Sequence, residues 1–135
     1  MATSKVKYIG SFRTASTHLK SGETIITDAP VDNNGKGEAF SPTDLLATSL
    51  ANCMITIMAM AADTHGIDLG GVEAELTKVM ATEPRRVSEI YVDFKFPNKD
   101  AYSDKDKKIL ERAAMTCPVS HSLHPAIKKE IHFNW

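Results

Sequence analysis

The chain has 135 residues, 16 basic and 17 acidic, and a formal net charge of −1. This length predicts a single domain over residues 1–135, and the balanced charge gives no electrostatic reason to expect binding to nucleic acid or to an anionic membrane. The start, MATSKVKYIG, has no apolar core of signal-peptide length, so we expect a cytoplasmic protein with reduced thiols.

The first third of the chain has the pattern of a β-meander. Residues 6–12 alternate apolar and polar side chains and predict a strand, while residues 14–19 either extend it or pair back against it. A turn at residues 20–23 precedes a third strand at residues 24–29, which is rich in isoleucine and threonine. Residues 30–39 fit no regular element and predict a loop.

Residues 41–66, SPTDLLATSLANCMITIMAMAADTHG, predict a long helix that the rest of the chain surrounds. Ser41 suits the N-cap, Pro42 the first turn and Gly66 the far end, and Asp44 is placed so that its side chain can reach back to the cap. Apolar residues are spread around the whole circumference, which predicts a helix buried on all sides. A membrane span is the alternative for this stretch, but its polar residues and the absence of a flanking aromatic girdle favour a core helix. One small sheet covers only one side of such a helix, so we expect a partner subunit.

The second half predicts a hairpin, a helix and a last strand. Residues 72–81 and 87–96 alternate as two strands of a hairpin that is apolar on one face. Ser103 and Asp106 predict the start of a second helix, which ends at Cys117. Pro118 breaks this helix and starts a short one near residues 119–123, and residues 127–135 alternate as a final strand.

The two cysteines, Cys53 and Cys117, leave three alternatives open. As buried free cysteines they are most simply small core residues, and the residues alone favour this interpretation. Redox chemistry is the second alternative: the helix start at Pro118 favours a Cys117 thiolate, whereas Cys53, inside an apolar helix, needs a cationic partner from elsewhere. A metal site built from Cys117, His121 and His124 is the third, but the proline interrupts this spacing and no second pair of ligands is near.

Arg13 is the best candidate for the cation that Cys53 needs. The chain has four arginines. Arg85 and Arg86 fall on a predicted hairpin turn, and Arg112 falls on the outward part of its helix. Arg13 remains by elimination, on or just after the first strand.

The segment SPTDLL opens an apolar helix that holds Cys53 within the letters NCM. Cys117 follows 64 residues later, within TCPVSHSLHP. This combination resembles the OsmC/Ohr family of thiol-dependent peroxidases. The similarity extends through SGETIITDAPVDNNGKGEAFSPTDLL and ILERAAMTCPVSHSLHP to nearly the whole chain. The resemblance implies an α+β fold: an intertwined OsmC-like homodimer with antiparallel sheets packed around long, buried central helices.

The resemblance also implies roles for the residues. Cys53 would attack an organic hydroperoxide and become a sulfenic acid, and Cys117 would condense with it to a disulfide. An external dithiol reductant, such as a lipoyl group on a carrier protein, would reopen that bond, and no bound cofactor or metal is needed. The function implied is an organic hydroperoxidase in oxidative stress defence.

The sequence departs from the best-characterised branch of the family at one position. A glutamate that pairs with the arginine follows the helix-opening proline in that branch, but Thr43 stands there in this chain. Asp44 is the nearest carboxylate, and Glu38 in the preceding loop is the second candidate partner for Arg13. This departure keeps a second hypothesis open, a non-catalytic OsmC-like dimer that binds a small hydrophobic ligand at its interface.

Overall fold

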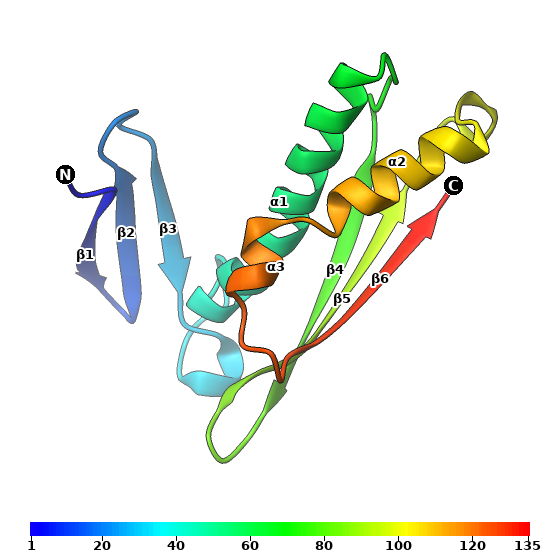
Figure 1. Cartoon of the computed structure of the whole chain (residues 1–135). Helices are drawn as coiled ribbons and strands as arrows, with labels where there is room; N and C mark the ends of the chain where they lie inside the picture. Colours follow the sequence, from blue (N-terminus) through cyan, green and yellow to red (C-terminus); the bar gives the residue numbers. More distant parts are fainter. The chain divides into compact units, whose positions relative to one another are not determined.

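The computed structural model describes residues 1–135, which fold as two compact units, Met1–Leu46 and Ala47–Trp135. The single-domain organisation of the chain stays a prediction. Figure 1 shows the elements in chain order. The strands and helices are β1 (Ser4–Gly10), β2 (Arg13–His18), β3 (Thr24–Asp28), α1 (Pro42–Thr64), β4 (Glu73–Ala81), β5 (Arg86–Lys95), α2 (Asp104–Ala114), α3 (Pro118–Ser122) and β6 (Lys128–Asn134), with 3-10 turns η1 (Val31–Asn33) and η2 (Lys99–Ala101).

The first unit contains the predicted meander, an antiparallel sheet in the order β1-β2-β3. The strand predicted over residues 6–12 ends at Gly10, because the chain turns back through a two-residue loop. Both loop residues, Ser11 and Phe12, have positive φ values, of 56° and 61°. Paired positive φ values match the twist of a hairpin, so Arg13 begins the next strand opposite Gly10.

A loop after β3 brings the chain to α1. Its two ends are joined by a hydrogen bond of 3.0 Å from the Asp28 N–H to the Phe40 carbonyl. Inside the loop the backbone passes close to itself, since a side-chain Cβ at Gly35 would lie only 1.6 Å from the carbonyl oxygen of Ala29. Only glycine fits at this position.

The N-terminus of α1 is capped as the sequence predicts. Ser41 Oγ accepts a hydrogen bond from the Asp44 N–H at 3.1 Å, and Asp44 Oδ2 accepts one from the Ser41 N–H at 3.0 Å. This reciprocal pair is a capping box, which satisfies two backbone donors that no helical carbonyl can reach.

Within the single chain α1 is buried along one side only, as the sequence predicts for one sheet, and burial of the other side by a partner subunit stays a prediction. The buried residues repeat every three or four positions, as a single stripe: Ala47, Leu50, Ala51, Met54, Met58 and Ala62. Leu46 is 43% exposed and Met60 is 61% exposed, away from that stripe. By length and composition alone Pro42–His65 could also cross a membrane, a test that core helices pass as well. One sheet covers only one face of a helix, so the remaining apolar face stays uncovered within this chain.

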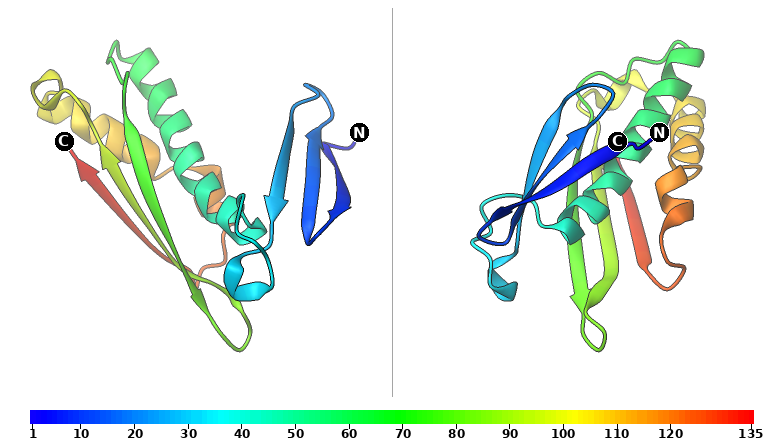
Figure 2. Two further views of the ribbon diagram at one scale, coloured as in Figure 1. Left: turned by 180° about the vertical axis from the view of Figure 1, so that it is seen from behind. Right: turned by 90° about the vertical axis from the view of Figure 1, so that its left-hand side faces the viewer.

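The second unit is built on the sheet β4-β5-β6. β4 and β5 form the predicted antiparallel hairpin, whereas β6 runs parallel to β5, so this sheet is mixed. Parallel neighbours need a long crossover, and here α2 and α3 supply it. The views in Figure 2 show the three strands as one twisted layer.

Helix α2 begins with a capping box, and an aromatic cluster holds it against this sheet. Ser103 and Asp106 form the predicted capping box, and Leu110 and Ala114 on the inner face are fully buried. At the C-terminal end of the sheet, Trp135 stacks on Phe96 with ring centroids 3.7 Å apart and donates a hydrogen bond to Glu111 Oε1 at 2.9 Å. These contacts fix the end of α2, after which the chain enters the turn that carries Cys117.

Candidate functional site

Cys53 lies at the edge of the buried stripe of α1. It follows Leu50 by one helical turn and precedes Met54, and both of these residues are fully buried. Cys53 itself is half-buried and carries a free thiol. Its side chain packs against the core that contains Cys117. It is therefore less enclosed than the sequence predicts, and a reactant has more access to it.

Cys117 is completely buried at the junction between α2 and α3. It is the N-cap residue of α3, and its Sγ accepts a hydrogen bond from the Ser120 N–H at 3.5 Å. The predicted helix start at Pro118 is thus present and directed at the sulfur.

The prediction that this helix start lowers the pKa of Cys117 is wrong in its net direction. Burial raises the pKa of the thiol, and a hydrogen bond to the Cys53 thiol raises it further, while the backbone N–H groups of Ser120 and Val119 lower it. Desolvation of a completely buried sulfur outweighs the two peptide dipoles. The interaction with Cys53 also shows that the two thiols are neighbours within the second unit.

Arg13 lies in the first unit, where it binds two carboxylates. Its Nη2 is 2.9 Å from Glu38 Oε2 and 3.3 Å from Asp28 Oδ2. Glu38 and Asp28 raise the pKa of Arg13 above its ordinary value, in that order of effect. The structure thus brings together Arg13 and Glu38, which the sequence named as a possible pair.

Asp28 is the member of this cluster that sequence reasoning missed. It is fully buried, and its Oδ2 accepts a hydrogen bond of 2.9 Å from the Glu38 N–H. That hydrogen bond lowers the pKa of Asp28 below its ordinary 3.8, and Arg13 lowers it further, although burial opposes both effects. Asp28 Oδ1 and Arg13 Nε are buried without a hydrogen-bond partner. Arg13 and Asp28 are directly opposite each other in the β2–β3 pair, so a correct register for this hairpin would have found the contact.

Asp44, the other predicted partner of Arg13, contributes to the helix cap. Its Oδ2 binds the Ser41 N–H, and Ser41 Oγ also contacts Thr43 Oγ1 at 3.2 Å. Asp44 therefore has a structural role at the start of α1 that does not depend on Arg13.

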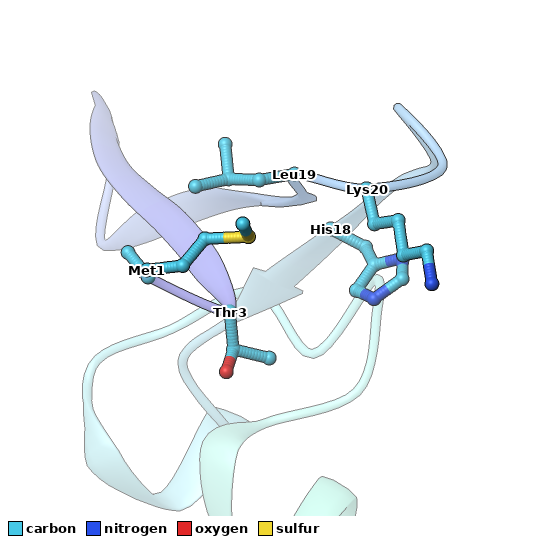
Figure 3. Close-up of a pocket in the computed structure, with 6 residues that line it drawn as sticks. Met1, Thr3, His18, Leu19 and Lys20 are labelled. Atoms are coloured by element: carbon cyan, nitrogen blue, oxygen red, sulfur yellow. The ribbon is translucent and has the colours of Figure 1, made fainter.

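The first unit also contains a cavity. A cavity of about 490 Å³ lies beside the start of β1, lined by Met1, Thr3, His18, Leu19 and Lys20 among others (Figure 3). None of the predicted site residues lines it. No group of three or more His, Cys, Asp and Glu side chains is placed to hold a metal ion. α3 ends at Ser122, so Cys117, His121 and His124 do not share one helix as the metal alternative requires.

The arrangement of the two thiols determines what chemistry is available. A half-buried thiol beside a fully buried one can be oxidised first and then react with its neighbour by thiol–disulfide chemistry. Both cysteines lie in the second unit, whereas Arg13, Asp28 and Glu38 lie in the first.

Comparisons with known proteins agree on one family. The family model described as OsmC-like protein matches residues 35–132. No curated protein matches the chain.

Several solved structures are similar over almost the whole length. One is a candidate osmotic stress induced and detoxification response protein from Psychrobacter arcticus 273-4, 54% identical, with a TM-score of 0.94 over 99% of this chain and 96% of that one. An organic hydroperoxide resistance protein OsmC from Legionella pneumophila is 15% identical, with a TM-score of 0.75 over 100% and 98% of the two chains. A candidate organic hydroperoxide resistance protein from Vibrio cholerae, with captopril bound in one of its active sites, is 14% identical, with a TM-score of 0.73 over 99% and 92%.

The last two likenesses show the α+β fold, and the family model and the 54% identical structure show the family. The chain belongs to the family of OsmC-like proteins.

Proposed function

We propose that the protein is a thiol-dependent peroxidase that reduces organic hydroperoxides to alcohols. The observation that carries this proposal is the contact between the half-buried Cys53 and the buried Cys117. Membership of the OsmC-like family and the hydroperoxide resistance names of structural neighbours support a role in redox chemistry or peroxide resistance.

The proposed reaction has two steps. The Cys53 thiolate attacks one oxygen of the hydroperoxide, the O–O bond breaks, and the alkoxide takes a proton and leaves as an alcohol while Cys53 becomes a sulfenic acid. The Cys117 thiolate then attacks the Cys53 sulfur, the S–O bond breaks, and the hydroxyl leaves with a proton as water. An external dithiol, such as a lipoyl group on a carrier protein, reduces the resulting disulfide, so no bound cofactor is required.

The substrate preference follows from the surroundings of Cys53. Leu46 and Met60 lie two helical turns before and after Cys53 on the same side of α1, and both are large apolar side chains that stay exposed. An alkyl tail gains about 0.8 kcal/mol for each buried CH₂, so this surface favours an organic hydroperoxide over hydrogen peroxide.

A homodimer in the cytoplasm is part of the proposal. Large apolar side chains remain exposed on both units, among them Tyr8, Phe12 and Ile25 in the first and Met60 in the second. Exposed apolar surface of this extent supports burial against a second copy. Sedimentation at low micromolar concentration tests it, and a monomer would count against it.

Arg13 keeps the role that the family resemblance implies, a cation that favours the Cys53 thiolate, with Glu38 as its carboxylate partner. This role stays a proposal. It predicts that Arg13→Met slows the first oxidation of Cys53 and leaves the later condensation with Cys117 unchanged.

Mass spectrometry of the intact reduced protein after one equivalent of cumene hydroperoxide tests the reaction. We expect the loss of two hydrogens and of both free thiols. Cys53→Ser should show no change, and Cys117→Ser should gain one oxygen and then a second. If the unmodified chain keeps both thiols for minutes, the peroxidase proposal is wrong, and a dimer that binds a small hydrophobic ligand becomes the better explanation.

A further inference from the structure

Lys129 occupies an apolar position in the last strand. Ile127, Ile131, Phe133 and Trp135 share its face of β6 and pack against the core. In the sheet register Lys129 lies opposite Ile90, which is fully buried. The alternation of the strand therefore predicts an apolar side chain at this position, but the residue is a lysine whose ammonium group reaches solvent.

The ammonium group of Lys129 makes two hydrogen bonds to a single residue of α3. Nζ donates to Ser120 Oγ at 2.9 Å and to the Ser120 carbonyl oxygen at 3.1 Å. Lys129 is exposed, so water is available to hydrate its ammonium group. Burial therefore does not by itself require the two hydrogen bonds to Ser120. A simple structural interpretation is available, since a lysine often binds the free carbonyl groups near the end of a short helix.

Ser120 connects this lysine to the candidate site. The Ser120 N–H donates to Cys117 Sγ at 3.5 Å, so Lys129 holds both the carbonyl and the hydroxyl of the residue whose amide contacts the sulfur. The contacts thus run from Lys129 through Ser120 to Cys117. All of them lie in the second unit together with Cys53.

We propose that Lys129 is a positioning residue for Cys117, which keeps the Ser120 N–H directed at Sγ while Cys117 attacks oxidised Cys53. The proposal rests on the proposed function and assigns Lys129 to its second step only. In that step Cys117 gives up its proton, and negative charge forms on a sulfur that is otherwise enclosed by apolar groups. An N–H group held in place stabilises that charge without having to reorganise.

The first test measures Cys117 alone and does not depend on peroxidase activity. In the Cys53→Ser background Cys117 is the only cysteine, so its titration is followed from pH 6 to pH 11 by NMR of the ¹³C-labelled cysteine Cβ, which needs no reagent to reach the buried sulfur. His121, four residues further along and exposed, is another titratable side chain on α3. Lys129→Met keeps the apolar stem and should move the midpoint of the Cys117 titration upward by about half a pH unit, a threefold loss of thiolate at a given pH.

Three further variants separate positioning from general support of the fold. Lys129→Arg keeps a donor and a charge, and it should restore most of the midpoint. Lys128→Met removes an exposed neighbour on the other face of the strand and should leave the midpoint unchanged. Ser120→Ala removes only the Oγ acceptor, so it should give a smaller shift of the same sign even if Lys129→Met does not fold. Fraying of α3 would expose the Cys117 sulfur and move the midpoint downward, because burial no longer raises the pKa of the thiol, and that result would overturn the proposal.

The second test follows the two redox steps with both cysteines present. After one equivalent of cumene hydroperoxide, Lys129→Met should oxidise Cys53 at the normal rate and form the disulfide about three to five times more slowly. More Cys53 sulfenic acid should then be trapped by dimedone. An unchanged ratio of the two rates would contradict the proposal. If the unmodified chain does not react at all, the proposed function fails, while the titration of Cys117 still decides whether Lys129 positions the Ser120 N–H.

Discussion

A disulfide between Cys53 and Cys117 should raise the thermal stability of the protein by a predictable amount. The bond closes a loop of 64 residues. In the chain-entropy model, closing a loop of this length removes about 4 kcal/mol of entropy from the unfolded state at 25 °C. With about 2.1 cal/mol/K of unfolding entropy per residue, this corresponds to a rise in Tm of at most about 15 °C for the whole chain.

The observed rise should be smaller than this limit. Cys117 is fully buried and its backbone is fixed by the cap of α3, so bond formation costs some native packing. We therefore expect Tm to rise by about 5 to 15 °C. Circular dichroism would compare the reduced protein, the peroxide-treated protein and the treated protein after dithiothreitol, with Cys117→Ser as the control. A fall in Tm on loss of both thiols would refute the reasoning, because it would mean that the native fold does not hold these sulfurs together.

Three further predictions concern the elements that carry the site. Leu50→Ala should destabilise the protein by about 2 to 5 kcal/mol in urea unfolding, whereas Leu46→Ala, at an exposed position, should cost much less unless a second subunit covers it. Ser41→Ala should cost about 1 kcal/mol through loss of the α1 cap, and Ser41→Asp should recover most of it; equal stability of all three would contradict the capping role. The pKa of Asp28 is lowered in the folded state, so its contribution to stability is complete above its ordinary value of 3.8 and is lost as pH falls through the folded pKa. Asp28→Asn should therefore show a flatter decline of Tm below pH 4 than the unmodified chain does, and a parallel decline would count against this assignment.

Features that depend on a few neighbouring residues were predictable from the sequence. The capping box at Ser41 was predicted because all its groups lie within one turn of helix, and so was the box at Ser103. The proximity of Cys53 and Cys117 was not, since a separation of 64 residues says nothing about distance in space. It came only from the resemblance to a family.

Two errors in the sequence interpretation have the same physical origin. The net pKa direction of Cys117 was wrong because a helix start is visible in the sequence and burial is not. Asp28 was missed although it lies in the strand predicted at residues 24–29, because the sequence does not show which residue of the neighbouring strand is opposite it; the β2–β3 register places it against Arg13 in a buried position. Both cases depend on how segments pack, and packing is a property of the folded chain.

The two carboxylates that bind Arg13 in the first unit limit how much its charge can stabilise a thiolate. One guanidinium binds both Asp28 and Glu38, so the three groups together carry a net charge of −1. A cation that is already shared between two carboxylates favours a third anion less than a free one does. Asp28 is fully buried and receives the Glu38 N–H, whereas the Glu38 side chain is 60% exposed. Glu38 is therefore the partner that Arg13 can give up at the lower cost.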